Sequence, residues 1–308
     1  MARTKKPRPR PAKRPAARAT WSRPSVVAVG LGAAVAAVAA IFIVSTDNGG
    51  SPAADPGPVH VHGLGVNPAD GSLFIATHTG LYRTAEDESR ATRVGTSSQD
   101  TMGFTIVGPD RFLGSGHPDR RQDLPPLLGL IESTNAGESW EPISLLGEAD
   151  FHVLRSAGER VYGYDATNDR LLASADEGRS WEELQRPGPM LDLAVHPSQR
   201  NRVVASAQGT SEPALYGSLD GGKSWRAIGQ VVGLLAWPAP DRLYAVTLDG
   251  EVLHSVDDGA TFERRGQIGG EAAAFVAEGD ADLYVALHDG TIKHSSDGGG
   301  SWTIRSLP

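Results

Sequence analysis

The chain has 308 residues, a formal net charge of −8 and no cysteine, which excludes disulfides, thiolate metal sites and thiol nucleophiles. All 37 Asp and Glu lie beyond residue 44, together with 20 of the 29 Lys and Arg, so that part of the chain carries a net charge of −17. So acidic a region argues against nucleic acid as a partner.

The N-terminal region has the pattern of a membrane anchor. Residues 1–24 hold nine basic residues, no acidic residue and several prolines, which predicts a disordered basic tail. The next 19 residues, 26–44, carry no charge, and at about 1.5 Å per residue they match a hydrocarbon core of ~30 Å. We expect an uncleaved transmembrane signal anchor over 25–44, with a cleaved signal peptide as the alternative. The basic flank places the N-terminus in the cytoplasm and the residues after 45 outside the cell.

A linker and then a repeated segment follow the apolar run. Residues 45–58 are rich in Gly, Ser, Pro and Asp, as flexible linkers are. The five copies of the repeated segment are STNAGESW (133–140), SADEGRSW (174–181), SLDGGKSW (218–225), SVDDGATF (255–262) and SSDGGGSW (295–302). They begin 41, 44, 37 and 40 residues apart, and such a period in a strand-rich chain predicts the blades of a β-propeller.

Each copy fits a tight hairpin between two strands. The Ser hydroxyl and Asp carboxylate can bond nearby backbone N–H groups, Gly can adopt a positive φ, and the aromatic residue can pack between blades. Asn135 and Phe262 replace the usual Asp and Trp but keep the role of the position. The predicted structural residues are Ser133, Asn135, Gly137, Trp140, Ser174, Asp176, Gly178, Trp181, Ser218, Asp220, Gly222, Trp225, Ser255, Asp257, Gly259, Phe262, Ser295, Asp297, Gly299 and Trp302.

This pattern resembles the Asp-box, or BNR, motif S-x-D-x-G-x-[ST]-W of sialidases and many other propellers. Further β-rich runs complete about four strands per unit, and a sixth, degenerate unit with Glu88 and Ala91 in place of Gly and the aromatic opens the series. We therefore predict an all-β, six-bladed propeller over 59–308, preceded by one transmembrane helix, with five or seven blades as the alternatives. We also expect the termini to exchange a strand in the closing blade, with residues 55–59 as the candidate.

The histidines concentrate on one face of this predicted ring. In propellers with Asp boxes the box joins the third and fourth strands, so the starts of the inner strands and the loops from strand two to three lie on the opposite face. The histidines assigned to that face are His60, His62, His78, His117, His152 and His288. The loop 115–127 on the same face is the longest and contains Asp119, Arg120, Arg121 and Asp123. The remaining histidines, His196, His254 and His294, are interpreted as packing or surface residues.

The segment PVHVHGLG (58–65) starts the first inner strand, where alternation puts His60 and His62 on one face. Neutral imidazoles with a carboxylate are a common ligand set for Zn, Cu, Ni or Fe. The predicted ligand-binding residues are His60, His62, His78, His117, His152 and Asp165, and those predicted to bind a divalent transition metal are His60, His62 and His152. The alternative is that these are scattered polar residues, solvated or hydrogen-bonded at loop ends.

The resemblance implies a sialidase-like glycoside hydrolase, yet no Arg triad or Tyr–Glu pair of the sialidase kind can be assigned, and no catalytic residue is predicted. Across 59–308 the chain more closely resembles bacterial membrane-anchored or secreted BNR-repeat proteins with an H-x-H-G-L-G opening, a group whose glycosylhydrolase-like label implies fold more than reaction. Ycf48-type assembly factors and sortilin-type receptors use similar repeats for binding. We expect a monomeric, membrane-anchored, extracytoplasmic propeller that binds a protein, a glycan or a metal ion through the face opposite the boxes. The alternative is a glycoside hydrolase acting on extracellular glycans.

Overall fold

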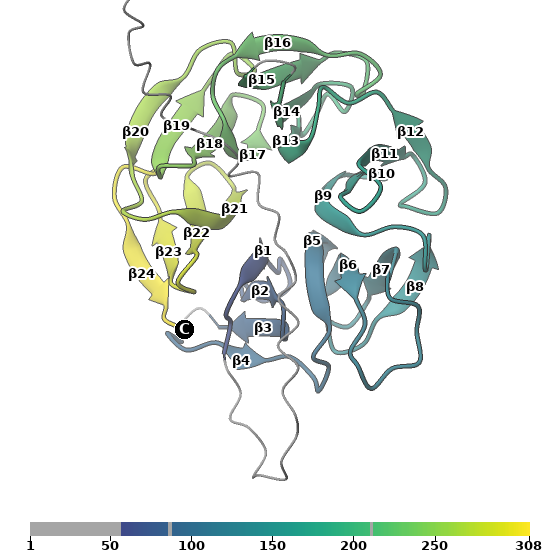
Figure 1. The fold of residues 1–308 in the computed structure, drawn as a ribbon. Coiled ribbons are helices and arrows are strands. Elements are labelled where there is room, and N and C mark those ends of the chain that lie inside the picture. The colour runs from purple at the N-terminus through teal and green to yellow at the C-terminus, as the bar shows by residue number, and fades with distance from the viewer. Residues whose placement is uncertain (1–56, 86–87, 210–211) are drawn as a thin grey trace, which may run out of the picture. The chain divides into compact units, whose positions relative to one another are not determined.

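The computed structural model describes residues 57–85, 88–209 and 212–308. Within these ranges every regular element is a β-strand, and six four-stranded sheets form a ring (Figure 1). This confirms the predicted all-β, six-bladed propeller. The predicted basic tail and transmembrane helix, and most of the linker, lie outside the described residues. No helix in the described part of the chain is long and apolar enough to span a membrane.

Each blade is one continuous segment whose four strands pair antiparallel in chain order. The strands of blades 1 to 3 are β1 (Val61–Val66), β2 (Leu73–Thr77), β3 (Gly80–Thr84), β4 (Thr92–Arg93), β5 (Asp100–Gly108), β6 (Arg111–His117), β7 (Leu130–Ser133), β8 (Glu141–Ser144), β9 (Phe151–Ala157), β10 (Arg160–Asp165), β11 (Arg170–Ser174) and β12 (Glu182–Leu184). The strands of blades 4 to 6 are β13 (Met190–Val195), β14 (Val203–Gln208), β15 (Pro213–Ser218), β16 (Arg226–Gly229), β17 (Gly233–Ala239), β18 (Arg242–Thr247), β19 (Glu251–Ser255), β20 (Glu263–Gln267), β21 (Ala272–Glu278), β22 (Asp282–Leu287), β23 (Ile292–Ser295) and β24 (Thr303–Ser306).

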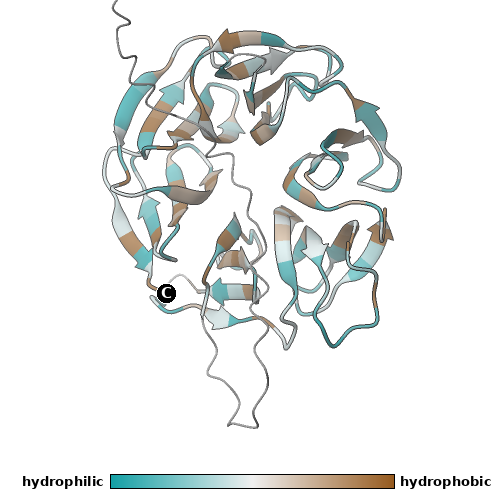
Figure 2. Ribbon diagram, in the orientation of Figure 1, coloured by the Kyte–Doolittle hydropathy of each residue, from teal (hydrophilic) through white to brown (hydrophobic). Residues whose placement is uncertain are grey.

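The hydrophobic core is divided into six clusters, each made by the facing sheets of two neighbouring blades. Between blades 1 and 2 the ring of Phe112 meets those of Phe74 and Phe104 edge to face, with centroids 4.7 and 5.7 Å away. The outermost strands are more hydrophilic, as β20 shows in Figure 2. A blade therefore buries its apolar surface only when both neighbours are in place.

The ring closes between blade 6 and blade 1 without the strand exchange that we expected from the sequence. The Arg305 guanidinium donates hydrogen bonds to the backbone carbonyls of Ala85 and Glu88, and Leu307 forms an isolated bridge with Arg90. The expectation was wrong because the last repeat supplies all four strands of blade 6 by itself. The hydrogen bonds of Arg305, the Arg90–Leu307 bridge and the apolar core between the two blades close the ring instead.

Five hairpins built from the repeated segment join the third and fourth strands of blades 2 to 6. In each, the Ser Oγ accepts a hydrogen bond from the Gly N–H at 2.8–2.9 Å and donates to the Asp or Asn side-chain oxygen at 2.7–2.9 Å. The same oxygen accepts the backbone N–H of the Ser or Thr four residues later, at 2.8–3.0 Å. Asn135 makes these contacts as the four Asp do, so a neutral amide is sufficient there.

The glycine of each hairpin also packs against the preceding blade, which the sequence pattern did not reveal. A Cβ added to Gly178 (φ +86°) would lie 2.0 Å from a methyl group of Leu130 in blade 2. A Cβ on Gly137 would lie 2.2 Å from Leu81 in blade 1. The glycine is therefore required both by its left-handed backbone and by the spacing between blades.

We predict that Gly178→Ala lowers the free energy of unfolding by about 2–5 kcal/mol, since a left-handed backbone costs about 1–2 kcal/mol and overpacking about 1–3. Gly71→Ala is the matched control, because Gly71 has φ +71° and no atom within 4 Å of its added Cβ. The control should lose only the backbone contribution. Urea denaturation of both variants measures the difference, and equal losses would contradict the packing argument.

A second prediction concerns the stability of the folded protein at acidic pH. Hydrogen bonds from Ser180 and Ser224 lower the pKa of Asp176 and Asp220, each to about 2. Because these values lie below the unfolded value near 3.9, the stabilisation is complete above about pH 4 and is lost as the pH falls towards 2. The variant Asp176→Asn/Asp220→Asn should flatten the pH dependence of unfolding between pH 4 and 2. A variant with the same slope as the wild type would show that these hairpins do not set acid stability.

Candidate functional site

Blades 1 to 3 gather imidazoles and carboxylates at one end of the ring. The strands of each blade alternate in direction, so the starts of the inner strands and the loops between second and third strands lie at the end opposite the five hairpins. Two groups form there. The first cluster consists of His62, His78 and Asp100, and the second cluster of His117, Asp150 and His152.

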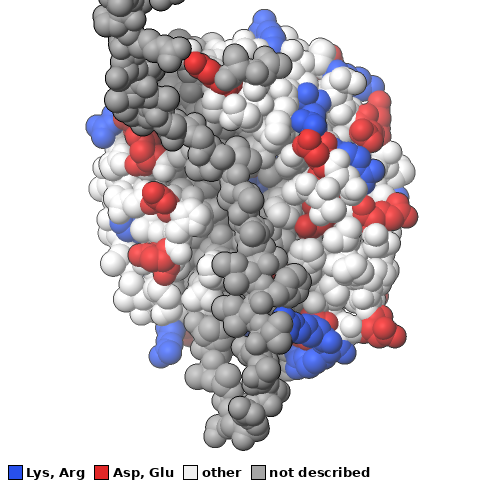
Figure 3. Space-filling view, in the orientation of Figure 1, with Lys and Arg blue, Asp and Glu red and all other residues white. Residues whose placement is uncertain are grey.

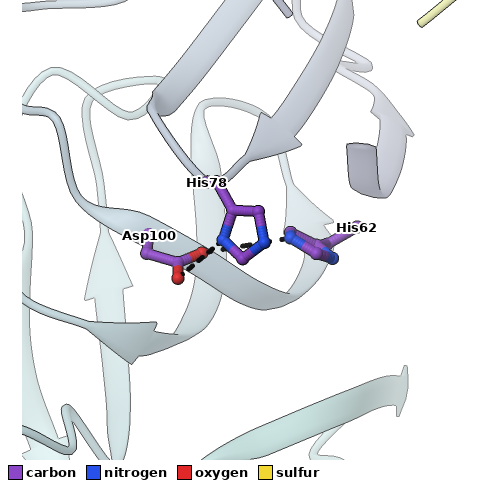
Figure 4. Close-up of side chains that lie close together, drawn as sticks. All are labelled: His62, His78 and Asp100. Atoms are coloured by element: carbon purple, nitrogen blue, oxygen red, sulfur yellow. Dashed lines mark ion pairs between the residues drawn. The ribbon is translucent and has the colours of Figure 1, made fainter. Parts of the chain in front are cut away.

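The first cluster spans the boundary between blades 1 and 2. His62 lies in β1, His78 follows β2, and Asp100 is the first residue of β5. The His78 ring lies between the other two side chains (Figure 4), with its centroid 4.4 Å from that of His62 and its Nδ1 2.8 Å from Asp100 Oδ2. One ligand atom from each of the three residues lies within 4.8 Å of the others. The group is therefore compact enough to share one small ligand.

Two atoms of the first cluster are buried without a hydrogen bond. Within the described residues neither His62 Nε2 nor Asp100 Oδ1 has a hydrogen-bond partner, and the two atoms are 4.0 Å apart. Burial, followed by repulsion from His78, lowers the pKa of His62 to about 4, so its imidazole is neutral at neutral pH. The hydrogen bond to Asp100 raises the pKa of His78. The cluster thus contains two buried polar atoms whose hydrogen-bonding capacity is not met by any group within the described chain.

The local backbone explains why His78 points at Asp100. The Thr77 hydroxyl donates to the carbonyl of Gly80 at 2.8 Å and accepts the N–H of Thr79 at 3.1 Å, which closes a tight turn around His78. Gly80 has φ +132°. On the other side, a Cβ on Gly116 would lie 2.1 Å from the Asp100 carbonyl oxygen, so only glycine permits β5 and β6 to approach there.

His60 lies beside the first cluster but not in it. Its ring is exposed, with a centroid 5.4 Å from that of His78. The predicted regular alternation of His60 and His62 is not what brings them together, because His60 has φ 53° and precedes β1, whose pairing shifts between Val61 and Gly63. Both imidazoles nevertheless flank His78.

The second cluster repeats this arrangement one blade further along. Asp150 directly precedes β9, and its Oδ2 lies 2.9 Å from His152 Nε2 and 3.6 Å from His117 Nε2. His117 ends β6, and its Nδ1 lies 2.8 Å from the carbonyl oxygen of Pro126. The N–H of Phe151 donates to Ser115 Oγ at 2.9 Å, which fixes β9 against β6. Asp150 Oδ1 is buried and has no hydrogen-bond partner among the residues described.

The structure places Asp165, the predicted carboxylate ligand, beneath the second cluster. Its side chain is fully buried and accepts hydrogen bonds from Arg170 and Asn168, at 2.7 Å each, and from the Asp150 N–H at 3.3 Å. Asp100 and Asp150, which our sequence reasoning missed, are the carboxylates in contact with the imidazoles of the two clusters. Both come at the start of an inner strand, in the place where blade 1 has its H-x-H segment, and that shared position was the signal available in the sequence.

The long loop 115–127 is braced over the segment that precedes Asp100. Asp119 is buried, accepts the N–H of Ser98 at 2.7 Å and pairs with Arg121. The Arg121 guanidinium also donates to the carbonyl of Thr96. The hydrogen bonds from Arg121 and Ser98 hold the pKa of Asp119 well below its usual range. Asp119 and Arg121 therefore support the site rather than line it.

The other four histidines lie apart from the two clusters. His196, His254 and His294 contact the rings of Trp237, Tyr244 and Tyr284, with centroids 4.9, 4.8 and 4.5 Å away. His288 is exposed in the loop of blade 6, and its backbone N–H donates to Glu271 at 3.2 Å. The predicted packing role of the first three agrees with these contacts.

Charged side chains of both signs are spread around the ring on the face shown in Figure 3. Several of them pair between blades, as Arg111 of blade 2 does with Glu177 of blade 3 at 2.9 Å. A pocket of about 370 Å³ lies beside this pair and is also lined by Gly158 and Arg200. It is separate from the two clusters, none of whose residues line it.

Comparison with known proteins shows the fold. No family model and no curated protein sequence matches the chain. Among solved structures, the GH74 enzyme of Niastella koreensis is similar with a TM-score of 0.59 at 13% identity, over 80% of this chain and 45% of that one. A chain of a nidogen/laminin complex has a TM-score of 0.61 at 12% identity, over 77% and 93%. YCF48 bound to a D1 peptide has 0.50 at 14%, over 81% and 83%. The chain therefore spans less than half of the GH74 enzyme.

Proposed function

We propose that this protein is a membrane-anchored, extracytoplasmic propeller that binds a divalent transition-metal ion at His62, His78 and Asp100. One observation carries the proposal. His62 Nε2 and Asp100 Oδ1 are buried polar atoms that lie 4.0 Å apart and have no hydrogen-bond partner in the described part of the chain. The membrane anchor and the outward orientation rest on the basic tail and the charge-free run at 26–44.

A cation is what these two atoms lack. Burying an acceptor without a partner costs about 1–3 kcal/mol, and more when the group is charged. A proton on His62 Nε2 does not satisfy Asp100 either, because an N–H···O hydrogen bond spans about 2.7–3.2 Å and the two atoms are 4.0 Å apart. Two atoms bound to one ion by bonds of about 2.0–2.2 Å lie at most ~4.4 Å apart. The observed separation of 4.0 Å is therefore within reach of a shared ion.

The ligand set decides which ions fit. Two imidazoles and one carboxylate suit Zn, Co, Ni, Cu or Fe, whereas Ca and Mg prefer oxygen ligands alone. The side chains of His62 and Asp100 are 17% and 22% exposed and that of His78 is 33% exposed, so the cluster opens to solvent on the His78 side. Three protein ligands with one open side leave a position for water or for a group from a bound molecule.

The Asp-box resemblance supports the same proposal from the scaffold. The five hairpins make the hydrogen bonds that the motif implies, at the end of the ring opposite the two clusters. We infer that the hairpins serve stability and the other end serves binding. The chain then belongs with membrane-anchored Asp-box propellers that bind rather than cleave.

We predict that the metal-free wild-type protein binds Zn²⁺ at this site and that His78→Ala weakens this binding by at least about 100-fold. Outer-shell substitutions alone cost 10–100-fold, and His78 is a direct ligand here. His288→Ala is the matched control, since His288 occupies the corresponding loop of blade 6 and is exposed. Calorimetric titration of chains without a histidine tag measures the affinities. A His78→Ala protein that binds like the wild type would refute the site.

The second candidate is a glycoside hydrolase, favoured by the likeness in fold to the GH74 enzyme of Niastella koreensis and by two carboxylates, Asp100 and Asp150, at one end of the ring. We expect the protein not to hydrolyse any of a panel of aryl glycosides and polysaccharides. Release of reducing sugar is the measurement. Turnover that disappears in Asp100→Asn or Asp150→Asn, but persists in Asp289→Asn in the exposed loop of blade 6, would replace the binding function with hydrolysis.

A further inference from the structure

We propose that His117 and Asp150, with His152 as a positioning residue, form a second divalent transition-metal site beside the first. This site stands independently of the first cluster, because it shares no residue with it. It differs from the set predicted from sequence, in which His152 joined His60 and His62. Here His152 belongs to a different carboxylate, one blade further round the ring.

The orientation of His117 is fixed by its contact with the backbone. A carbonyl oxygen only accepts hydrogen bonds, so the 2.8 Å contact with Pro126 places the proton on Nδ1 of His117. The other nitrogen, Nε2, then faces Asp150 Oδ2 at 3.6 Å. In the neutral ring this is a lone pair that faces a carboxylate, and a metal ion bound by both atoms would make the arrangement favourable. A carbonyl behind the imidazole and a carboxylate in front of it is how metal-binding histidines are commonly held.

Asp150 is held ready to bind a cation. Its side chain is 4% exposed, and its Oδ1 is buried with no hydrogen-bond partner in the residues that the structure describes. Since a carboxylate only accepts, His152 donates its Nε2–H to Oδ2 at 2.9 Å and fixes the carboxylate from the outer side. The backbone N–H of Asp150 is bound to Asp165, so the residue is anchored at both ends.

The two sites repeat one construction. In each, an imidazole from the end of a blade's second strand meets a carboxylate from the start of the next blade's inner strand: His78 with Asp100, and His117 with Asp150. Asp100 and His117 are also cross-strand partners in blade 2, which makes the sites immediate neighbours. Access differs, because the side chains of His117 and His152 are 42% and 37% exposed. With two direct protein ligands and more water, the second site should bind more weakly than the first.

The test is a titration of the metal-free full-length chain, without a histidine tag, with Co²⁺ and Zn²⁺. Calorimetry and Co²⁺ absorption should show two equivalents of bound metal ion per chain in the wild type and one in His117→Ala. The affinity of the tighter binding step should be the same in both proteins. Asp150→Asn keeps the shape of the buried side chain and should also lose the weaker step. His288→Ala again serves as the control and should keep both, and circular dichroism checks that every variant is folded.

The outcomes separate the two proposals. The second site is refuted if the His117→Ala protein still binds two equivalents of metal ion with unchanged dissociation constants. It is also refuted if the wild type binds only one equivalent and the His117→Ala protein binds that equivalent equally well. If His78→Ala changes nothing while His117→Ala removes an equivalent, the function proposed for the first cluster fails and the second site stands. Loss of the weaker step in both His117→Ala and Asp150→Asn supports it.

Discussion

The constraint on which the whole structure depends is that apolar surface is buried only between blades. Each of the six hydrophobic clusters belongs to two neighbouring sheets, so stability is a property of the closed ring rather than of any one repeat. The hairpin glycines set how closely adjacent sheets approach, as the packing of Gly178 on Leu130 shows. A regular spacing of blades then brings the same positions of successive repeats together at one end of the ring.

That regularity is what makes a polar site possible. A His at the end of one blade's second strand and an Asp at the start of the next blade's inner strand belong to successive repeats. They are well separated in the sequence, yet they face each other across the boundary between the blades. The Ser115 hydroxyl holds the boundary between blades 2 and 3 in register, and the turn around His78 orients that side chain towards blade 2. Among the described residues, the histidine–carboxylate pairs that cross a boundary between blades lie in blades 1 to 3, whereas the His294–Asp282 pair lies within blade 6.

Repetition allowed the fold to be predicted from the sequence, because five copies of one hairpin and one degenerate unit give the number of blades and the direction of their strands. The site was only partly readable. The rule for the faces grouped His62, His78, His117 and His152 correctly at one end, but it gave no distances between loops of different blades. The partners Asp100 and Asp150 were missed, and Asp165 was chosen instead, because burial and pairing with Arg170 are set by tertiary packing. The mode of ring closure was predicted wrongly for a similar reason, since the hydrogen bonds of the Arg305 side chain to blade 1 have no sequence pattern that predicts them.

The seam between blades 6 and 1 has a further consequence. Without a shared strand, blade 1 is joined to blade 6 by core packing, side-chain hydrogen bonds and the isolated Arg90–Leu307 bridge, and the region is a candidate for the lowest-energy partial opening of the ring. Blade 1 supplies His62 and His78, while blade 2 supplies Asp100. A ligand shared by these residues fastens blade 1 to its other neighbour, and by mass action it raises the work needed to peel that blade away. A ligand bound at this site would therefore also stabilise the N-terminal blade, which follows the proposed membrane anchor in the sequence.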